Sequence, residues 1–229
     1  MKVSIVIPAC NEEKYLGQCL KSVTQQIEKP DEVIVVDNNS TDKTAEIAKQ
    51  FGAKVIKEKK QGTIFARNRG FNEAKYEIIA RCDADTILPK DWIKKIKNNF
   101  QKNINALTGP VIFYDLPFHF AFSTKIYFLF LKVIQGFKNT LAGPNMILTK
   151  SLWNKVKNNV CLDDKKVHED IDLALHINKV GGKIYVDPSL VVKVSGRRII
   201  SNPFSFFCEY PIRIIKTEFN HRSIIFFVV

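Results

Sequence analysis

The sequence lacks several features that mark other classes of protein. No apolar run reaches the ~18 residues of a membrane-spanning helix. The five cysteines show neither C-x-x-C spacing nor histidines at zinc-finger spacing, which predicts buried thiols in a reducing compartment. No signal peptide precedes the first apolar run, so we expect a cytoplasmic location. The glycine-rich loops G-x-G-x-x-G and G-x-x-x-x-G-K-S/T are both absent, which argues against a dinucleotide-binding site and a P-loop.

Positive charge is in clear excess. Lysine and arginine outnumber the acids by 35 to 23 in 229 residues, which gives a formal net charge of +12. Such a balance predicts an anionic partner, which is either a nucleotide phosphate, a nucleic acid or an acidic membrane face. The lysines are dispersed rather than gathered on one stripe, and no nucleic-acid-binding module is recognisable, so we expect no nucleic-acid partner.

Strands and helices are predicted to alternate through the first half of the chain. Apolar runs typical of buried strands lie at 2–8, 32–37, 54–57 and 76–82, and helical patterns lie at 11–26, 43–51 and 63–74. This order predicts an α/β fold with a mostly parallel central sheet and helices on both faces. The second half is predicted to be a modified sheet, with strands at 106–114, 145–149, 183–187 and 190–195 and a helix at 169–180.

Asp83 and Asp85 end the apolar run that begins at Tyr76. In an open parallel sheet, ligands bind at the carboxyl ends of the strands. Two carboxylates one residue apart are oxygen ligands that suit Mg²⁺ or Mn²⁺ carrying a diphosphate. The alternative is that they are solvated turn residues that cap the next helix. A second D-x-D triplet, Asp170–Asp172, shows that the spacing alone is not specific.

Acids and amides follow the other predicted strands too. The segments 8–12, 37–40 and 61–62 join 83–85 at one edge if the strands are parallel. Such side chains suit hydrogen bonds to a base and a ribose, while a metal ion would hold the phosphates. This combination predicts a nucleotide-sugar ligand.

Five motifs stand in the order seen in one family. They are IVIPACNE at 5–12, VVDNNSTDKT at 35–44, GTIFARNRG at 62–70, DAD at 83–85 and HEDIDLAL at 168–175. From residue 1 to about 195, the chain therefore resembles glycosyltransferase family 2. The resemblance implies a GT-A fold, a UDP- or GDP-sugar donor, a divalent metal ion (Mn²⁺ or Mg²⁺) and inversion at the anomeric carbon.

The resemblance also implies roles for individual residues. The base and ribose pocket would consist of Pro8, Ala9, Asn11, Glu12, Asp37, Gly62, Arg67 and Asn68. Asp85 would ligate the metal ion, Asp83 would face the ribose or the metal ion, and the pair Glu169–Asp170 would supply the catalytic base. We divide the chain into a nucleotide-binding half (1–100), an acceptor and catalytic-base half (101–198) and a C-terminal extension (199–229).

The chemistry of inverting transfer points to the same acids. A carboxylate must take the proton of the acceptor hydroxyl while a metal ion stabilises the departing diphosphate. Asp170 is the first candidate and Glu169 the second; the alternative is that both only stabilise the positive end of a helix. Arg197 and Arg198 are candidates for a clamp on the donor phosphates, or else form an exposed basic turn. For Arg67, the alternative is that it is an ordinary solvated cation on a helix.

Two other functions are compatible with the sequence. A sugar nucleotidyltransferase has a related fold, but a glycine-rich basic loop is then expected where this chain has residues 8–12. A module that binds nucleic acid or an anionic surface would explain the net charge. Within family 2, the absence of a Q-x-x-R-W motif predicts single or few sugar additions rather than polymer synthesis.

Two apolar segments interrupted by basic residues lie at 116–137 and 203–229. Such segments can lie in a membrane interface with their lysines toward anionic headgroups. They predict peripheral contact with the inner face of the membrane and a glycan or lipid-linked acceptor. The alternative is that both segments pack on the sheet or on a second subunit.

Overall fold

Strands and helices alternate in the computed structural model, which describes residues 1–116, 139–163, 166–202, 204 and 209–221. The described strands are β1 (Val3–Ala9), β2 (Glu32–Asp37), β3 (Lys54–Lys57), β4 (Ile78–Arg81), β5 (Ala106–Thr108), β6 (Val111–Phe113), β7 (Met146–Thr149), β8 (Ile184–Val186) and β9 (Val192–Val194). The described helices are α1 (Leu16–Thr24), α2 (Thr44–Gln50), α3 (Thr63–Glu73), α4 (Trp92–Phe100), the 3₁₀ turn η1 (Gly143–Asn145), α6 (Lys150–Val156), α7 (Glu169–Lys179), α8 (Arg197–Ser201) and α9 (Tyr210–Asn220).

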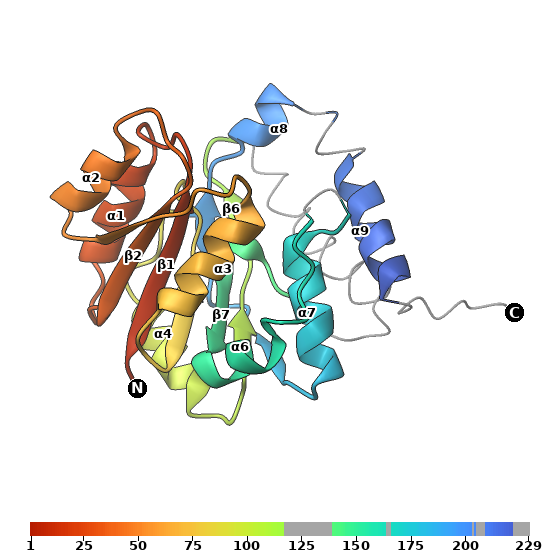
Figure 1. Cartoon of the computed structure of the whole chain (residues 1–229). Helices are drawn as coiled ribbons and strands as arrows, with labels where there is room; N and C mark the ends of the chain where they lie inside the picture. The colour runs from red at the N-terminus through yellow and green to blue at the C-terminus, as the bar shows by residue number, and fades with distance from the viewer. Residues whose placement is uncertain (117–138, 164–165, 203, 205–208, 222–229) are drawn as a thin grey trace, which may run out of the picture.

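A seven-stranded sheet in the order β3-β2-β1-β4-β7-β5-β8 forms the centre of the molecule (Figure 1). The strands β1 to β4 are parallel, and their registers place Ala9 beside Asp37, Asp37 beside Lys57, and Val6 beside Arg81. β7 runs antiparallel to β4 and β5, whereas β5 and β8 are parallel. β6 and β9 form a separate parallel pair. The predicted α/β fold with a mostly parallel central sheet is confirmed, and the carboxyl ends of β1 to β4 meet at one edge.

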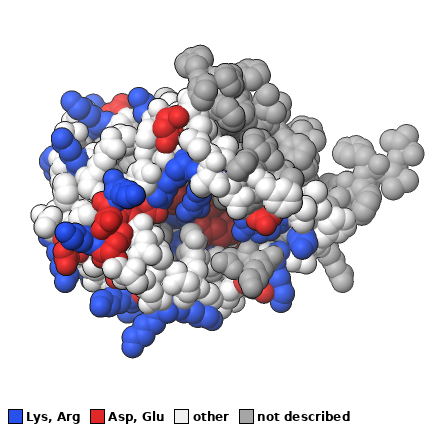
Figure 2. Space-filling view, turned by 90° about the horizontal axis from the view of Figure 1, so that it is seen from above, with Lys and Arg blue, Asp and Glu red and all other residues white. Residues whose placement is uncertain are grey.

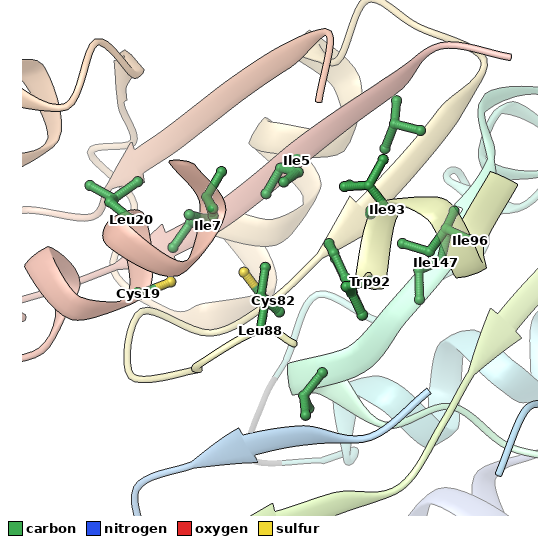
Figure 3. Packing of buried hydrophobic residues seen from close by; sticks show 14 of the residues in the cluster. Ile5, Ile7, Cys19, Leu20, Cys82, Leu88, Trp92, Ile93, Ile96 and Ile147 are labelled. Carbon is green, nitrogen blue, oxygen red and sulfur yellow. The ribbon is translucent and has the colours of Figure 1, made fainter. Parts of the chain in front are cut away.

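Helices cover both faces of this sheet because its central strands are apolar on both sides. All residues of β4 and all but one of β1 are buried. On one face, Leu20 of α1 and both Trp92 and Ile93 of α4 belong to the same apolar cluster as Ile5 and Ile7 of β1 (Figure 3). Helices α3, α6 and α7 cover the opposite face (Figure 1).

Two predicted boundaries are wrong. The helix predicted to follow the first strand begins only at Leu16, because Asn11 has a φ of 54° and forms part of a loop. The strand predicted at 106–114 is divided into β5 and β6, which belong to different sheets. The division falls at Gly109, where a Cβ atom would lie 2.1 Å from the carbonyl oxygen of Leu190. Only glycine allows the two backbones to approach so closely.

The C-terminal helix α9 packs on α7, on the side of the molecule away from α1 and α2 (Figure 1). Ile214 of α9 joins Ile171 and Leu175 of α7 in a small apolar cluster. Among the helices of the described ranges, none is long and apolar enough to cross a membrane. The predicted interfacial segment 116–137 lies outside the described residues from position 117 onward.

Candidate active site

The loops after β1 and β2 are fastened to each other at the carboxyl edge of the sheet. The backbone N–H of Asn11 donates to Ser40 Oγ (3.0 Å), and the N–H of Thr41 donates to Asn11 Oδ1 (2.8 Å). Asp37 is buried at the end of β2, and its Oδ1 accepts from the N–H of Ser40 (3.1 Å). Asn11 and Asp37, which are predicted to bind base and ribose, therefore lie in one hydrogen-bonded pair of loops.

Asn38 joins a third loop to this edge. Its Nδ2 donates to the carbonyl oxygens of Glu58 (2.9 Å) and Lys60 (2.8 Å), and its Oδ1 accepts from the N–H of Gly62 (2.8 Å). The N–H of Glu58 also donates to the carbonyl oxygen of Asp37 (2.9 Å). Gly62, which directly precedes α3, is thereby held close to the loop after β2.

Two carboxylates, those of Asp85 and Glu12, contact Arg197, the first residue of α8. Arg197 Nε lies 3.3 Å from Asp85 Oδ2, and its NH2 group bonds to Glu12 Oε1. The same guanidinium lies over the ring of Tyr15, with Cζ 4.1 Å from the ring centroid. Asp83 lies close enough to Asp85 for its charge to act on the ionisation of Asp85. Segments from the two ends of the chain thus meet at the D-x-D triplet.

The carboxylates of this group lack full compensation of their charge. Burial raises the pKa of Asp85 to about 6, the charge of Asp83 adds to this effect, and Arg197 opposes it. Glu12 is also buried, and its Oε2 has no hydrogen-bond partner among the described residues. Carboxylates that repel each other and retain a free oxygen fit a divalent cation, because the ion would compensate several charges at once.

A second group of acids, at the start of α7, is built around Arg81. This last residue of β4 is only 2% exposed. Its NH2 lies 2.9 Å from Asp83 Oδ1, while its NH1 lies 2.7 Å from Glu169 Oε1 and 3.6 Å from Asp170 Oδ1. One guanidinium therefore connects the D-x-D triplet with the acid pair Glu169–Asp170.

Arg67 and Gly143 complete the surroundings of the acid pair. Arg67 is fully buried on α3; its NH1 lies 3.2 Å from Glu169 Oε2 and donates to the Glu169 carbonyl oxygen (3.0 Å). The N–H of Gly143 donates to Asp170 Oδ2 (2.8 Å). A Cβ atom at position 143 would lie 2.9 Å from the same oxygen and 3.2 Å from Arg81 NH2, so only glycine leaves room for both groups.

The two acids differ in their ionisation. Burial raises the pKa of Asp170 to about 7, the charge of Glu169 adds to the effect, and Arg81 opposes it. Burial acts in the same direction on Glu169, but Arg81 and Arg67 outweigh it and hold the pKa of Glu169 below its usual value. Neighbouring carboxyl groups with separated pKa values suit one permanent anion and one group that exchanges a proton near neutral pH.

The structure separates the residues predicted for the base and ribose pocket. Pro8 and Ala9 end β1 and Asp37 ends β2, while Asn11 and Gly62 lie on the connected loops after β1 and β3. The others lie elsewhere along the edge. Glu12 contacts Arg197, and Asn68 Oδ1 accepts from Nε (2.9 Å) and NH2 (2.8 Å) of Arg67, which faces the acid pair.

The contacts of Arg67 and Arg197 do not fit the two alternatives considered for them. Arg67 is not a solvated helix cation, because its side chain is fully buried. Arg197 is not part of a free basic turn, since it contacts Asp85 and Glu12. Its neighbour Arg198 is close enough for its charge to lower the pKa of Asp85.

Sequence reasoning missed Arg81, although a signal for it exists. Arg81 stands at the end of an otherwise apolar strand, and an arginine is rarely buried unless it is paired. An arginine within such an apolar run indicates a buried side chain with acidic partners, a signal that the sequence analysis did not use. No comparable signal marked Tyr15 or Gly143, because their contacts come from distant parts of the chain.

Seen from the carboxyl edge, acidic side chains gather near the middle of the surface, with Lys and Arg side chains around them (Figure 2).

A separate hollow of about 420 Å³ on α3 and α6 is lined by Asn68, Asn72, Lys150, Trp153, Asn154, Lys157 and Asn158. Lys150 is already engaged there, because its Nζ donates to the carbonyl oxygens of Phe71, Asn72 and Ala74. We therefore place the candidate site at the edge, where the perturbed carboxyl groups are.

Comparison with known proteins establishes the family. The family model described as "Glycosyl transferase family 2" matches residues 4–156. The chain belongs to glycosyltransferase family 2. This family-2 chain is 37% identical over 101 residues to Glycosyltransferase AglE of Haloferax volcanii, a match covering 41% of this chain and 33% of that protein. It thus spans about a third of that relative's length.

A second relative matches nearly the whole chain. It is the "Dolichyl N-acetyl-alpha-D-glucosaminyl phosphate 3-beta-D-2,3-diacetamido-2,3-dideoxy-beta-D-glucuronosyltransferase" of Methanococcus voltae, at 25% identity over 252 residues, covering 95% of this chain and 75% of that protein. A solved structure shares the fold: glucosyl-3-phosphoglycerate synthase from Mycobacterium tuberculosis, in complex with Mn²⁺, UDP and glucosyl-3-phosphoglycerate. It superposes with a TM-score of 0.65 at 18% identity, over 89% of this chain and 79% of that chain. The predicted GT-A fold is confirmed.

Proposed function

We propose that this chain is an inverting glycosyltransferase that moves a sugar from a UDP- or GDP-sugar to an acceptor hydroxyl, in single or few additions. The observation that carries the proposal is the arrangement around Arg81, whose guanidinium contacts Asp83 on one side and Glu169 on the other. A group suited to the donor diphosphate and a group suited to proton transfer thus lie within reach of one side chain. Displacement at a single carbon atom requires this kind of proximity.

The donor would lie along the carboxyl edge of β1 to β4. Asp37 and the fastened loops after β1 and β2 would bind the base and the ribose. Asp83 and Asp85 would hold Mn²⁺ or Mg²⁺, an assignment supported by the raised pKa of Asp85 and by the unpartnered oxygen of Glu12. When bound, the ion would stabilise the negative charge of the departing nucleoside diphosphate. The related mycobacterial structure contains Mn²⁺ and UDP, which supports the binding of a metal ion and a nucleoside diphosphate here.

Arg197 and Arg198 would also contribute to donor binding. Arg197 contacts Asp85 and Glu12, so its guanidinium already lies beside the residues proposed for the metal ion. Once those carboxylates are occupied, the guanidinium would be released to bind donor phosphate oxygens, for which its planar fork is well suited.

Asp170 would act as the catalytic base. Its Oδ2 is fixed by the N–H of Gly143, whereas its Oδ1 has no hydrogen-bond partner among the described residues. This oxygen would take the proton of the acceptor hydroxyl while the hydroxyl oxygen bonds to the anomeric carbon, opposite the leaving diphosphate. Glu169 would stay ionised between Arg81 and Arg67 and keep both arginines in position. Attack from the side opposite the leaving group inverts the configuration of the sugar.

The acceptor is proposed to be a glycan or a lipid-linked molecule at a membrane surface. Helix α9 exposes Ile212, Ile215 and Phe219, whose exposed fractions are 51%, 45% and 53%. These residues share one face of the helix, and the exposed Lys216 lies on the same face. An anionic bilayer surface fits apolar side chains mixed with lysine. The name of the Methanococcus relative also contains a dolichyl-linked sugar phosphate.

A panel of UDP- and GDP-sugars tests the proposed function. We expect at least one donor to raise the melting temperature of the protein in the presence of Mn²⁺ but not after addition of a chelator, because donor binding would stabilise only the folded state. Stabilisation by nucleic acid alone would contradict the proposal. Release of pyrophosphate from a nucleoside triphosphate and a sugar phosphate would instead indicate a nucleotidyltransferase.

A further inference from the structure

A second group of metal-binding side chains lies between α7 and α9, away from the D-x-D triplet. It consists of Asp172, His176 and His221, whose ligand atoms all lie within 4.8 Å of one another. Asp172 and His176 are four residues apart on α7 and share one face of that helix, while His221 follows the last residue of α9. Asp170 is two residues before Asp172, roughly 200° away around the helix. The group therefore does not belong to the acid pair.

We propose that Asp172, His176 and His221 bind one zinc ion, or a transition-metal ion of similar chemistry, and that this ion fastens α9 to α7. The proposal does not depend on the proposed glycosyl transfer. Two imidazole nitrogens and one carboxylate oxygen form a ligand set found at zinc sites, with the fourth position taken by water.

The distances in this group suit a tetrahedral ion. His221 Nε2 lies 2.8 Å from Asp172 Oδ1, and His176 Nε2 lies 3.7 Å from the same oxygen. Bonds of about 2.0–2.2 Å to a tetrahedral zinc ion separate neighbouring ligand atoms by about 3.4 Å. The two imidazole rings are already nearly perpendicular, at an angle of 75° with centroids 4.7 Å apart. Small movements of the side chains would therefore admit the ion.

A hydrogen bond from outside the group orients the carboxylate. The N–H of Cys161 donates to Asp172 Oδ2 (2.9 Å), which leaves Oδ1 directed at the histidines. Carboxylate ligands of metal ions are commonly held by such partners. The same contact ties the segment before α7 to the group.

The charges in this group favour a cation. Asp172 is 1% exposed, and among the described residues no lysine or arginine forms an ion pair with it. Lys179 Nζ lies 2.9 Å from His221 Nδ1. An ammonium group only donates hydrogen bonds, so Nδ1 is the acceptor in this contact. The ion-pair contacts of Asp172 within the described ranges are to the two histidines, and a metal dication would place a full positive charge beside this buried carboxylate.

Lys179 also provides a test of the metal site. When a metal ion occupies Nε2, the proton of the neutral imidazole must lie on Nδ1, where it repels the ammonium of Lys179. Lys179 is exposed, so it would have to turn into solvent. The side-chain oxygen of a glutamine at this position would instead accept a hydrogen bond from Nδ1–H, as residues around metal ligands usually do. We therefore expect Lys179→Gln to bind zinc more tightly than the wild type.

The experiment is a zinc titration of the full chain without a histidine tag, in competition with a zinc-binding dye and with excess Mg²⁺ present. We expect one bound zinc ion per chain. His176→Ala and His221→Ala should each weaken binding by a factor on the order of 100 or more, since each removes a ligand. Asp85→Ala is the matched control, because it alters the other carboxylate site and should bind zinc like the wild type. Circular dichroism checks that each variant is folded, and His176→Gln replaces any variant that is not.

Hydrogen exchange gives a second readout that does not involve activity. Zinc should slow the exchange of the amides of α9 in the wild type and in Asp85→Ala, but not in His176→Ala. The proposal is wrong if no zinc is retained, if Asp85→Ala loses the ion, or if the histidine variants bind zinc like the wild type. Unchanged zinc affinity in Lys179→Gln would also contradict the assigned geometry.

Discussion

Arg81 is expected to set the pH at which the proposed base becomes active. Its NH1 lies 3.6 Å from Asp170 Oδ1, a distance at which two unit charges attract by about 4–5 kcal/mol in a medium of effective dielectric constant near 20. Removal of this positive charge favours the protonated form of Asp170 and so raises its pKa. Even a quarter of that energy, about 1 kcal/mol, moves a titration by most of one pH unit.

The perturbation is Arg81→Met, and the assay is the pH dependence of kcat/KM for the donor identified by the panel. In the wild type, activity should rise with pH through about 7, because Asp170 must lose its proton to act as the base. In Arg81→Met, the rising limb of the plot of kcat/KM against pH should move to higher pH by roughly one unit or more. Activity should therefore fall more strongly at acidic than at alkaline pH. Arg69→Met is the matched control, because Arg69 is exposed and pairs with Glu73 instead of with Glu169 or Asp170.

Stability needs a separate variant, because Arg81→Met leaves Glu169 with one partner fewer in a buried position. Breaking a buried ion pair costs about 3–5 kcal/mol of folding free energy. The double variant Arg81→Met with Glu169→Gln removes both charges. It should recover part of the stability and return the rising limb toward lower pH, since Glu169 raises the pKa of Asp170. An unchanged rising limb in folded Arg81→Met would refute this reasoning.

Three further predictions concern the metal ion, the base and the membrane. Asp85→Ala should abolish Mn²⁺-dependent donor binding in calorimetry, and wild-type affinity would contradict its role. Asp170→Asn should retain donor binding but lower turnover by about 10²–10⁴-fold, the usual contribution of a general base; if Glu169→Gln is the more severe change in the same assay, the two roles are exchanged. In sedimentation with anionic liposomes at low salt, the wild type should bind, and the pair Ile215→Ser and Phe219→Ser should bind less; equal binding would exclude this face of α9.

Much of the first half of the fold was predictable because local patterns determine it. Apolar runs predicted β1, β2 and β4, and parallel pairing then brought their ends to one edge. The position of Asp83 and Asp85 followed directly from the end of β4. The start of α1 was mispredicted, since the loop before it is held by contacts to the loop after β2, which no local pattern reveals.

The contacts within the candidate site were less predictable because they join distant parts of the chain. Arg197 meets Glu12, which lies 185 residues earlier, and Arg67 meets Glu169, which lies 102 residues later. The identity of the acids was visible in the sequence, but their different ionisation was not. It depends on burial and on two arginines that only the fold brings together.

The most direct test of the proposed function follows the configuration of the sugar released from its donor. The protein would be incubated with Mn²⁺ and each α-linked UDP- or GDP-sugar of the panel, without acceptor, and proton NMR would record which anomer of the sugar appears first. If Asp170 activates water in place of the acceptor, the β-anomer should appear first, and neither a chelator-treated sample nor Asp170→Asn should release sugar at a comparable rate. Initial release of the α-anomer would contradict inversion.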